Sequence, residues 1–258
     1  MQKGDKKEEK LEIEEQIKRK MARIKRRIAV MSGKGGVGKS TVTALLAVHF
    51  ARQGKLVGVL DADFLGPSIP KLFGIERKKP LSGIDGLEPV LTPKYAIRVM
   101  SLQFMTPEGI AVIWRGPMIS KVLEDFIAHT SWGNLDYLIV DMPPGTGDAP
   151  ITVLQDIPLD GVIMVATPHD LAANIVERAI NMARSMNTDV IGIVENMSYY
   201  RCPECGRIAR FGKSTALLAK KYGLKILASI PLEESLAHYC DAGIVEEYKT
   251  DYFEGVEF

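Results

Sequence analysis

A glycine-rich segment with two lysines offers the clearest chemistry in this sequence. Residues 33–40 read Gly-Lys-Gly-Gly-Val-Gly-Lys-Ser, which fits the phosphate-loop pattern G-x-x-x-x-G-K-[ST] and adds a lysine directly after the first glycine. Glycines let the backbone turn tightly and bring its N–H groups against phosphate oxygens, while the following helix directs its positive end toward the same anion. In this pattern Lys39 reaches the β- and γ-phosphates, and the Ser40 hydroxyl can bind Mg²⁺. The segment therefore predicts a nucleotide site.

Three aspartates follow apolar runs and could serve the same nucleotide. Asp61 and Asp63 occupy alternate positions after one run, so both side chains can point the same way. One could position the attacking water and the other could support the Mg²⁺ shell, although aspartate is also a favoured turn residue. Asp141 closes the run 136–140, an arrangement that holds Mg²⁺ through water in phosphate-loop enzymes.

Asn196 follows another apolar run, over 190–195. A side-chain amide has both a donor and an acceptor, which suits the edge of adenine. Helix capping explains an asparagine at this position equally well.

Cys202 and Cys205 form a Cys-x-x-Cys pair that predicts a metal or cluster ligand site. Thiolates at this spacing bind zinc or iron–sulfur clusters, and both normally require four ligands. Cys240 falls in a helical pattern, and we expect it to be a small buried residue. A two-fold dimer would bring two pairs together as four thiolates. The residues alone leave a shared [4Fe–4S] cluster and a shared zinc ion both open.

The elements that position these residues alternate along the chain, and they predict an α/β fold with a mostly parallel sheet covered by helices on both faces. Ligands of such sheets bind beyond the carboxyl ends of the strands, where every motif above falls. We expect strands at 27–31, 55–60, 97–102, 135–140, 161–166, 190–194 and 225–230. We expect helices at 41–52, 117–129, 171–186 and 233–240, and a long excursion with a hairpin within 72–94.

Both ends of the chain differ in character from its middle. Residues 1–27 hold eleven basic and six acidic residues, and apolar residues recur at a spacing of three or four from Ile13 to Ile28. This predicts an amphipathic helix over 7–26, laid against the domain or frayed, with partner docking as the alternative. The predicted organisation is an N-terminal arm at 1–26, an ATPase domain at 27–245 with a Cys-x-x-Cys insertion near 199–212, and a C-terminal tail at 246–258. The aromatic tail is either disordered or packed against the domain.

Composition limits the function classes. With 258 residues and 46% hydrophobic content, the chain can bury one large core. No apolar run approaches the roughly 20 residues of a membrane span, and the charged N-terminus is unlike a signal peptide, so we expect a cytoplasmic protein without membrane contact. Residues 28–258 carry 22 basic and 26 acidic residues, which argues against a nucleic-acid-binding domain.

Taken together, these motifs resemble the Mrp/ApbC family of iron–sulfur cluster carrier ATPases, within the MinD/ParA superfamily of P-loop proteins. The likeness runs in order from about residue 27 to residue 243. Besides the phosphate loop, it rests on Asp61-Ala62-Asp63, Gly66-Pro67-Ser68, Trp114-Arg115-Gly116-Pro117, residues 141–148, Glu195-Asn196-Met197-Ser198 and Cys202-Pro203-Glu204-Cys205.

The resemblance implies a three-layer P-loop NTPase that uses ATP, Mg²⁺ and a [4Fe–4S] cluster. It implies that Lys34 reaches across a homodimer to the nucleotide of the partner, that Asp63 is the hydrolytic carboxylate and that Asn196 contacts adenine. Lys39 joins Lys34 and Asp63 as a catalytic residue, and Asp61 and Asp141 join Ser40 at Mg²⁺. The residues expected to bind nucleotide are Gly33, Lys34, Gly35, Gly36, Val37, Gly38, Lys39, Ser40, Thr41 and Asn196.

The function expected from the residues and the resemblance is a homodimeric ATPase that holds a labile cluster at its interface. It would receive the cluster from scaffold proteins and pass it to apo-proteins. A MinD/ParA-type positioning ATPase is the first alternative, although residues 241–258 are acidic and lack a basic helical face. A reductase resembling the nitrogenase iron protein and a zinc-bridged regulatory ATPase are the others.

Overall fold

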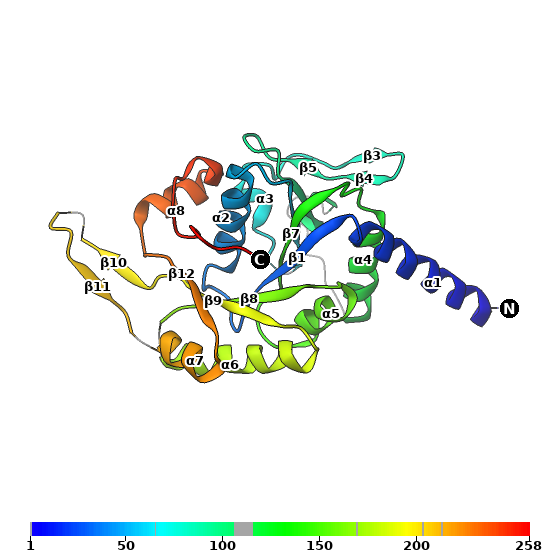
Figure 1. Cartoon of the computed structure of the whole chain (residues 1–258). Coiled ribbons are helices and arrows are strands. Elements are labelled where there is room, and N and C mark those ends of the chain that lie inside the picture. Colours follow the sequence, from blue (N-terminus) through cyan, green and yellow to red (C-terminus); the bar gives the residue numbers. More distant parts are fainter. Residues whose placement is uncertain (1, 65, 106–115, 169, 203, 213) are drawn as a thin grey trace.

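A central sheet of eight strands organises the chain (Figure 1). The structure is a computed structural model that describes every residue except 1, 65, 106–115, 169, 203 and 213. All neighbouring strands in the sheet are parallel except the antiparallel pair β5–β6, so the predicted mostly parallel sheet is confirmed. In spatial order the strands are β12 (Lys225–Ser229), β9 (Val190–Glu195), β8 (Gly161–Ala166), β1 (Ile24–Ser32), β7 (Leu135–Asp141), β2 (Val57–Asp61), β6 (Arg98–Ser101) and β5 (Val90–Leu91).

Helices cover both faces of the sheet and enclose two hydrophobic cores. Successive side chains of a strand point to opposite faces, so Ile28 and Val30 of β1 enter one core while Ala29 and Met31 enter the other. The first core is covered by α2 (Lys39–Arg52), α3 (Ile69–Leu72), α8 (Glu234–Asp241) and the 3₁₀ turn η2 (Val245–Glu247). The second is covered by α1 (Gln2–Met21), α4 (Gly116–His129), α5 (Asp148–Asp156), α6 (Asp170–Ser185) and α7 (Ser214–Tyr222). A further 3₁₀ turn, η1 (Leu102–Met105), follows β6.

The N-terminal helix ends earlier than its apolar spacing predicts. α1 stops at Met21, and residues 24–26 belong to β1, so the expected extension of the helix to residue 26 is wrong. The periodic pattern continues to Ile24 and Ile28, but these side chains enter two different cores from a strand. Ile17 and Met21 are buried against the body, and Figure 1 shows the start of α1 leading away from the sheet.

Two small hairpins stand outside the main sheet. β3 (Leu81–Gly83) pairs with β4 (Gly86–Glu88) inside the predicted excursion at 72–94, and β10 (Tyr199–Arg201) pairs with β11 (Ile208–Arg210) on either side of the Cys-x-x-Cys segment. Helices α5 and α7 were not predicted. In the described part of the chain, no helix has both the length and the apolar character that crossing a membrane requires.

The C-terminal tail packs against the domain, which settles one of the two expectations for it. Tyr248, Phe253 and Val256 are buried in the same core as α2. The Phe50 ring of α2 stacks on Tyr137 of β7, with ring centroids 4.0 Å apart. The tail therefore packs on the α2 side of the sheet, where the Phe258 ring meets Phe50 edge-on with ring centroids 5.8 Å apart.

Candidate nucleotide site and cysteine pair

The phosphate-loop segment connects the carboxyl end of β1 to the start of α2, as its sequence predicts. Gly36 and Gly38 have φ values of 76° and 79°, the left-handed region that glycine adopts without a Cβ penalty. The loop borders a cavity of about 280 Å³, which Thr41 also lines. Because α2 begins at Lys39, its N-terminal N–H groups face this cavity and favour an anion there.

Lys39 lies at the centre of a cluster of predicted site residues. Its Nζ is 2.8 Å from Asp141 Oδ2 and 3.6 Å from Asp63 Oδ2, and the Lys39 side chain is only 6% exposed. Lys39 also donates a hydrogen bond of 3.3 Å to Ser40 Oγ. The structure thus brings together an ammonium, a hydroxyl and two carboxylates from α2, β7 and the turn after β2.

Asp141 is wholly buried and accepts hydrogen bonds on both carboxylate oxygens. Ser40 Oγ donates to Oδ2 at 2.6 Å, and Thr43 Oγ1 donates to Oδ1 at 2.7 Å. Thr43 was not among the predicted site residues. Its spacing of three residues from Ser40 places both hydroxyls on one face of α2, and this spacing is the signal that could have identified it.

Asp61 lies beneath this cluster and is shielded from solvent. Its carboxylate accepts hydrogen bonds from the Asp63 N–H at 3.2 Å and from Ser101 Oγ at 3.1 Å. Burial raises the pKa of the Asp61 carboxyl, the charge of Asp141 raises it further, and the Lys39 ammonium offsets only part of the rise. A further cation beside Asp61 would lower this pKa again, because an opposite charge favours the ionised carboxylate. Ser101, at the end of β6, was missed because no phosphate-loop motif includes it.

Asp63 stabilises the turn after β2 and also borders the cavity. Its Oδ1 accepts a 3.2 Å hydrogen bond from the Gly66 N–H, which closes the turn after β2. Its Oδ2 faces Lys39 and the cavity. The oxygen ligands available from Ser40, Asp61 and Asp141 are the hard donors that Mg²⁺ prefers, so the residues present fit that ion.

Asn196 contacts the phosphate loop itself. Its Nδ2 donates a 2.8 Å hydrogen bond to the carbonyl oxygen of Val37, and the side chain is buried. A Cβ at Gly38 would lie 2.1 Å from this Nδ2, so the glycine is required for the approach. Neither predicted role included this contact, because it joins segments far apart in the sequence.

Lys34 is exposed and stands apart from the Lys39 cluster. The Ser32 hydroxyl donates a 2.9 Å hydrogen bond to the Lys34 carbonyl oxygen, which fixes the backbone while leaving the side chain free to extend. Of the motif at 114–117, Trp114 and Arg115 lie outside the described residues, and Gly116 begins α4.

Cys202 and Cys205 lie in the turn of the β10–β11 hairpin, which projects from the body (Figure 1). Hydrogen bonds from the Cys205 and Glu204 backbone N–H groups, and from the Cys205 thiol, lower the pKa of the Cys202 thiol. Among the described residues, no group of three or more His, Cys, Asp or Glu side chains is placed to hold a metal ion. Cys240 is buried in the α2–α8 core, which confirms the prediction made for it.

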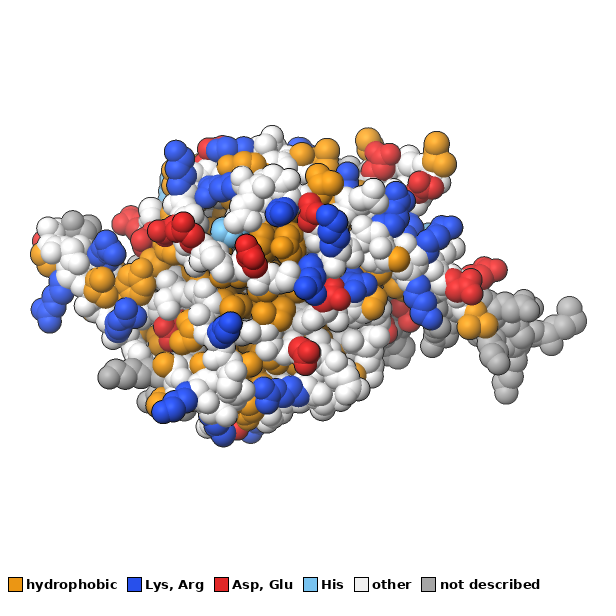
Figure 2. All heavy atoms as spheres, viewed as in Figure 1, with side chains coloured by type: hydrophobic (Ala, Val, Ile, Leu, Met, Phe, Trp, Pro, Cys, Tyr) orange, Lys and Arg blue, Asp and Glu red, His pale blue; other side chains and the backbone are white. Residues whose placement is uncertain are grey.

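Hydrophobic side chains extend along the same hairpin. Tyr200, Ile208 and Phe211 are exposed, and Figure 2 shows apolar surface on the projecting hairpin and where it joins the body. Exposed apolar surface of this kind marks interaction sites in soluble proteins.

Comparison with known proteins relates most of the chain to one family. A model of the ParA family, described as NUBPL iron-transfer P-loop NTPase, matches residues 23–254. The iron–sulfur cluster carrier protein of Aquifex aeolicus is 46% identical over 230 residues, and the match covers 88% of this chain but only 63% of that protein. The carrier protein of Methanocaldococcus jannaschii is 44% identical over 232 residues, with 88% of this chain and 80% of that protein covered.

Solved structures show the same fold. A nucleotide-binding protein from Archaeoglobus fulgidus, in complex with ADP, is 50% identical, with 95% of this chain and 97% of that chain covered and a TM-score of 0.87. The cell division protein MinD of Aquifex aeolicus has a TM-score of 0.59 at 22% identity over 84% of this chain and 87% of that chain, which shows a shared fold.

Proposed function

The chain belongs to the ParA family of NUBPL-type iron-transfer P-loop NTPases, and from this membership we propose that it is an ATP-hydrolysing carrier of a [4Fe–4S] cluster. Two copies of the chain hold the cluster between them and pass it to apo-proteins in the cytoplasm, after receiving it from a scaffold protein. The observation that carries the proposal is the pair of thiols on the projecting β10–β11 hairpin. This hairpin begins shortly after Asn196, whose side chain is hydrogen-bonded to the phosphate loop at the Val37 carbonyl.

The proposed nucleotide chemistry uses the Lys39 cluster. Mg²⁺ held by Ser40 and Asp141, with Asp61 behind them, would supply charge neutralisation to the β- and γ-phosphates. Lys39 turns from Asp141 toward the phosphates, and Asp63 orients the attacking water and accepts its proton. Lys34, exposed at the edge of the loop, reaches the nucleotide of the second copy.

The proposed cluster site is completed by dimerisation. Cys202 and Cys205 provide two thiolates, and the lowered pKa of the Cys202 thiol favours the ligating form. A second copy related by a two-fold axis provides the other two, because an isologous interface repeats the same patch. Docking of the two hairpins also covers the apolar surface of Tyr200, Ile208 and Phe211. Two ligands per chain leave the cluster accessible for transfer.

The route from nucleotide to cluster is short in sequence. Asn196 holds the Val37 carbonyl, and Cys202 follows six residues later across β10. A change in the loop on ATP binding therefore alters the base of the hairpin. Clients and scaffolds recognise the dimer in one of its two states, with ATP bound or without it.

The test is anaerobic reconstitution with iron and sulfide, followed by absorbance, iron analysis and molar mass by light scattering. We expect a charge-transfer band and four iron atoms per dimer, lost in Cys202→Ala and in Cys205→Ala. Cys240→Ala is the matched control, because that thiol is buried in the core and should leave the band intact. A wild-type band in Cys202→Ala would overturn the proposal, and stoichiometric zinc in protein purified without air would favour the zinc-bridged alternative.

A further inference from the structure

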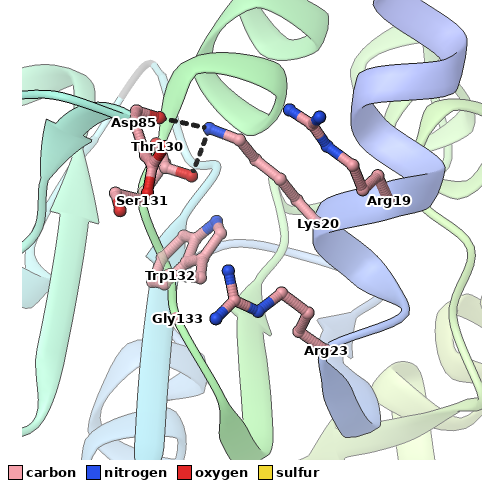
Figure 3. A pocket seen from close by; sticks show the side chains of 8 residues that line it. All are labelled: Arg19, Lys20, Arg23, Asp85, Thr130, Ser131, Trp132 and Gly133. Atoms are coloured by element: carbon pink, nitrogen blue, oxygen red, sulfur yellow. Dashed lines mark hydrogen bonds between the residues drawn. The ribbon is translucent and has the colours of Figure 1, made fainter.

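A second cavity lies near the amino end of β1, whereas the phosphate loop follows the carboxyl end of the same strand. It has a volume of about 260 Å³ and is enclosed by the end of α1, the β3–β4 turn and the segment before β7 (Figure 3). The nine residues of β1 separate it from the loop, a length of about 26 Å at the usual rise of a strand. The cavity is therefore distinct from the nucleotide site.

The cavity is lined mainly by positive charge. Arg19, Lys20 and Arg23 border it, and Asp85 is the one carboxylate among its described lining residues. Within the described part of the chain, Arg19 has no hydrogen-bond or ion-pair partner, and Arg23 donates only through Nε, to Asn134 at 3.2 Å. Guanidinium groups with unused N–H donors are suited to phosphate and carboxylate oxygens.

A buried donor adds to these cations. Trp132 is 1% exposed, and its indole Nε1 has no hydrogen-bond partner among the described residues. A buried N–H without a partner is costly, so an acceptor at this position is favoured. Figure 3 shows the indole nitrogen on the edge of the ring that faces the α1 side chains.

The walls of the cavity are held in place by hydrogen bonds that do not use Arg19, the Arg23 side chain or the Trp132 indole. Lys20 Nζ donates to the carbonyl oxygens of Asp85 and Thr130, each at 2.9 Å, which joins α1 to both other walls. From behind, Arg98 Nη1 donates to the carbonyl oxygens of Trp132 at 2.6 Å and of Asn134 at 3.2 Å. These bonds hold in place the backbone segments that carry the three donors, while the Arg19 and Arg23 side chains themselves are exposed.

We propose that this cavity binds a phosphate group from solution, either inorganic phosphate or a small phosphorylated molecule, with Arg19, Arg23 and the Trp132 indole N–H as donors. A tetrahedral anion offers oxygens in several directions and can meet donors from α1 and from the β7 side together. A planar carboxylate has only two oxygens, which suit a single guanidinium, so it is expected to use fewer of the three donors. Binding also ties α1 to the body, since the donors come from both.

The test uses Trp132 as the reporter. The chain has two tryptophans, Trp114 and Trp132, so a Trp114→Phe background isolates the signal of the cavity. Inorganic phosphate is titrated at constant ionic strength with saturating Mg²⁺ and a non-hydrolysable ATP analogue, whose γ-phosphate keeps inorganic phosphate out of the phosphate loop. We expect a saturable fluorescence change. Arg19→Gln and Arg23→Gln should each raise the dissociation constant about tenfold, as expected for losing one charge-assisted hydrogen bond.

The matched control is Lys18→Gln, which removes the same charge from an exposed position in the same turn of α1. It should change the dissociation constant less than twofold, and acetate should not reproduce the signal. Equal losses in Lys18→Gln and Arg19→Gln, an equal response to acetate, or no saturable change would each overturn the proposal. Binding to phosphatidate vesicles without binding of inorganic phosphate would overturn the proposal that the ligand comes from solution.

Discussion

The Lys39 ammonium lies 2.8 Å from Asp141 Oδ2, and the two side chains are only 6% and 0% exposed. Asp63 contacts the same ammonium at 3.6 Å, while Asp61 lies below with its pKa raised by burial and by Asp141. A single lysine therefore compensates the buried negative charge of this region. The same ammonium is the group proposed to meet the phosphates of ATP, so folding and nucleotide binding depend on one side chain.

Lys39→Ala is expected to lower both nucleotide affinity and the free energy of unfolding. It leaves Asp141 charged and buried without a cation, which typically costs about 3–5 kcal/mol. Denaturant unfolding and ADP calorimetry measure the two effects. Lys34→Ala removes an exposed lysine from the same loop and should leave the free energy of unfolding within about 0.5 kcal/mol of wild type. Equal stability of the two variants would show that Asp141 does not depend on Lys39.

Gly38→Ala is expected to destabilise the loop, because φ at this position is 79° and the new Cβ would lie 2.1 Å from Asn196 Nδ2. The combined strain and lost hydrogen bond should cost about 2–4 kcal/mol. Thermal unfolding measures the loss. Gly35→Ala is the control, since a Cβ there meets nothing within 4 Å and the backbone is not left-handed. An unchanged midpoint of thermal unfolding in Gly38→Ala would mean that the hydrogen bond from Asn196 to Val37 does not restrict the loop.

Sequence patterns predicted the part of the site that is local in the chain. Residues 33–40 and Asp141 carry their chemistry in short motifs, so their placement followed from the strand that precedes each one. Thr43 could have been found from its spacing of three residues from Ser40 on α2. Ser101 and the Val37 carbonyl act through partners distant in sequence, and no single-chain pattern encodes those pairings. The anion cavity was missed for the same reason, since its donors come from residues 19–23 and from residue 132.

The fold was predicted best where burial is continuous. The runs at 161–166 and 190–195 are strands with apolar residues on both faces, a pattern typical of parallel sheets. The predicted end of the N-terminal helix was wrong because Ile24 and Ile28, which lie in β1, happen to continue the helical spacing of apolar residues. Helices α5 and α7 were missed, and each has only nine residues, about two turns of periodicity. Length alone does not explain this, because the eight-residue α8 was predicted.

Asn196→Ala should weaken ATP binding more than GTP binding. Loss of the hydrogen bond to the Val37 carbonyl loosens the loop and should reduce both affinities by a similar factor, about five- to tenfold. The proposed adenine contact adds a further loss that only ATP experiences. Parallel calorimetric titrations with the two nucleotides separate these contributions. Equal losses would leave Asn196 as a positioning residue for the loop, without an adenine contact.

Asp160→Asn should destabilise the fold in a pH-dependent way. Arg27 donates to the Asp160 carboxylate through its backbone N–H at 2.8 Å, Nε at 3.0 Å and Nη2 at 2.7 Å. Burial pushes the pKa of Asp160 upward, but the hydrogen bonds and charge of Arg27 outweigh it and hold the pKa below its ordinary value. The pair is partly exposed, so its loss should cost about 1–2 kcal/mol at pH 7.

The sign of the pH dependence follows from the lowered pKa of Asp160. The folded state favours the charged carboxylate, so the stabilisation is complete above the ordinary aspartate pKa of about 3.9 and is lost as the pH falls through the lower folded value. Denaturant unfolding of wild type and Asp160→Asn between pH 7 and pH 3 should therefore show curves that converge toward the acid end. Asp251→Asn, an exposed carboxylate, controls for the change in net charge and should track wild type throughout. A gap between wild type and Asp160→Asn that stays constant down to pH 3 would mean that lost packing, rather than the ion pair, destabilises the variant.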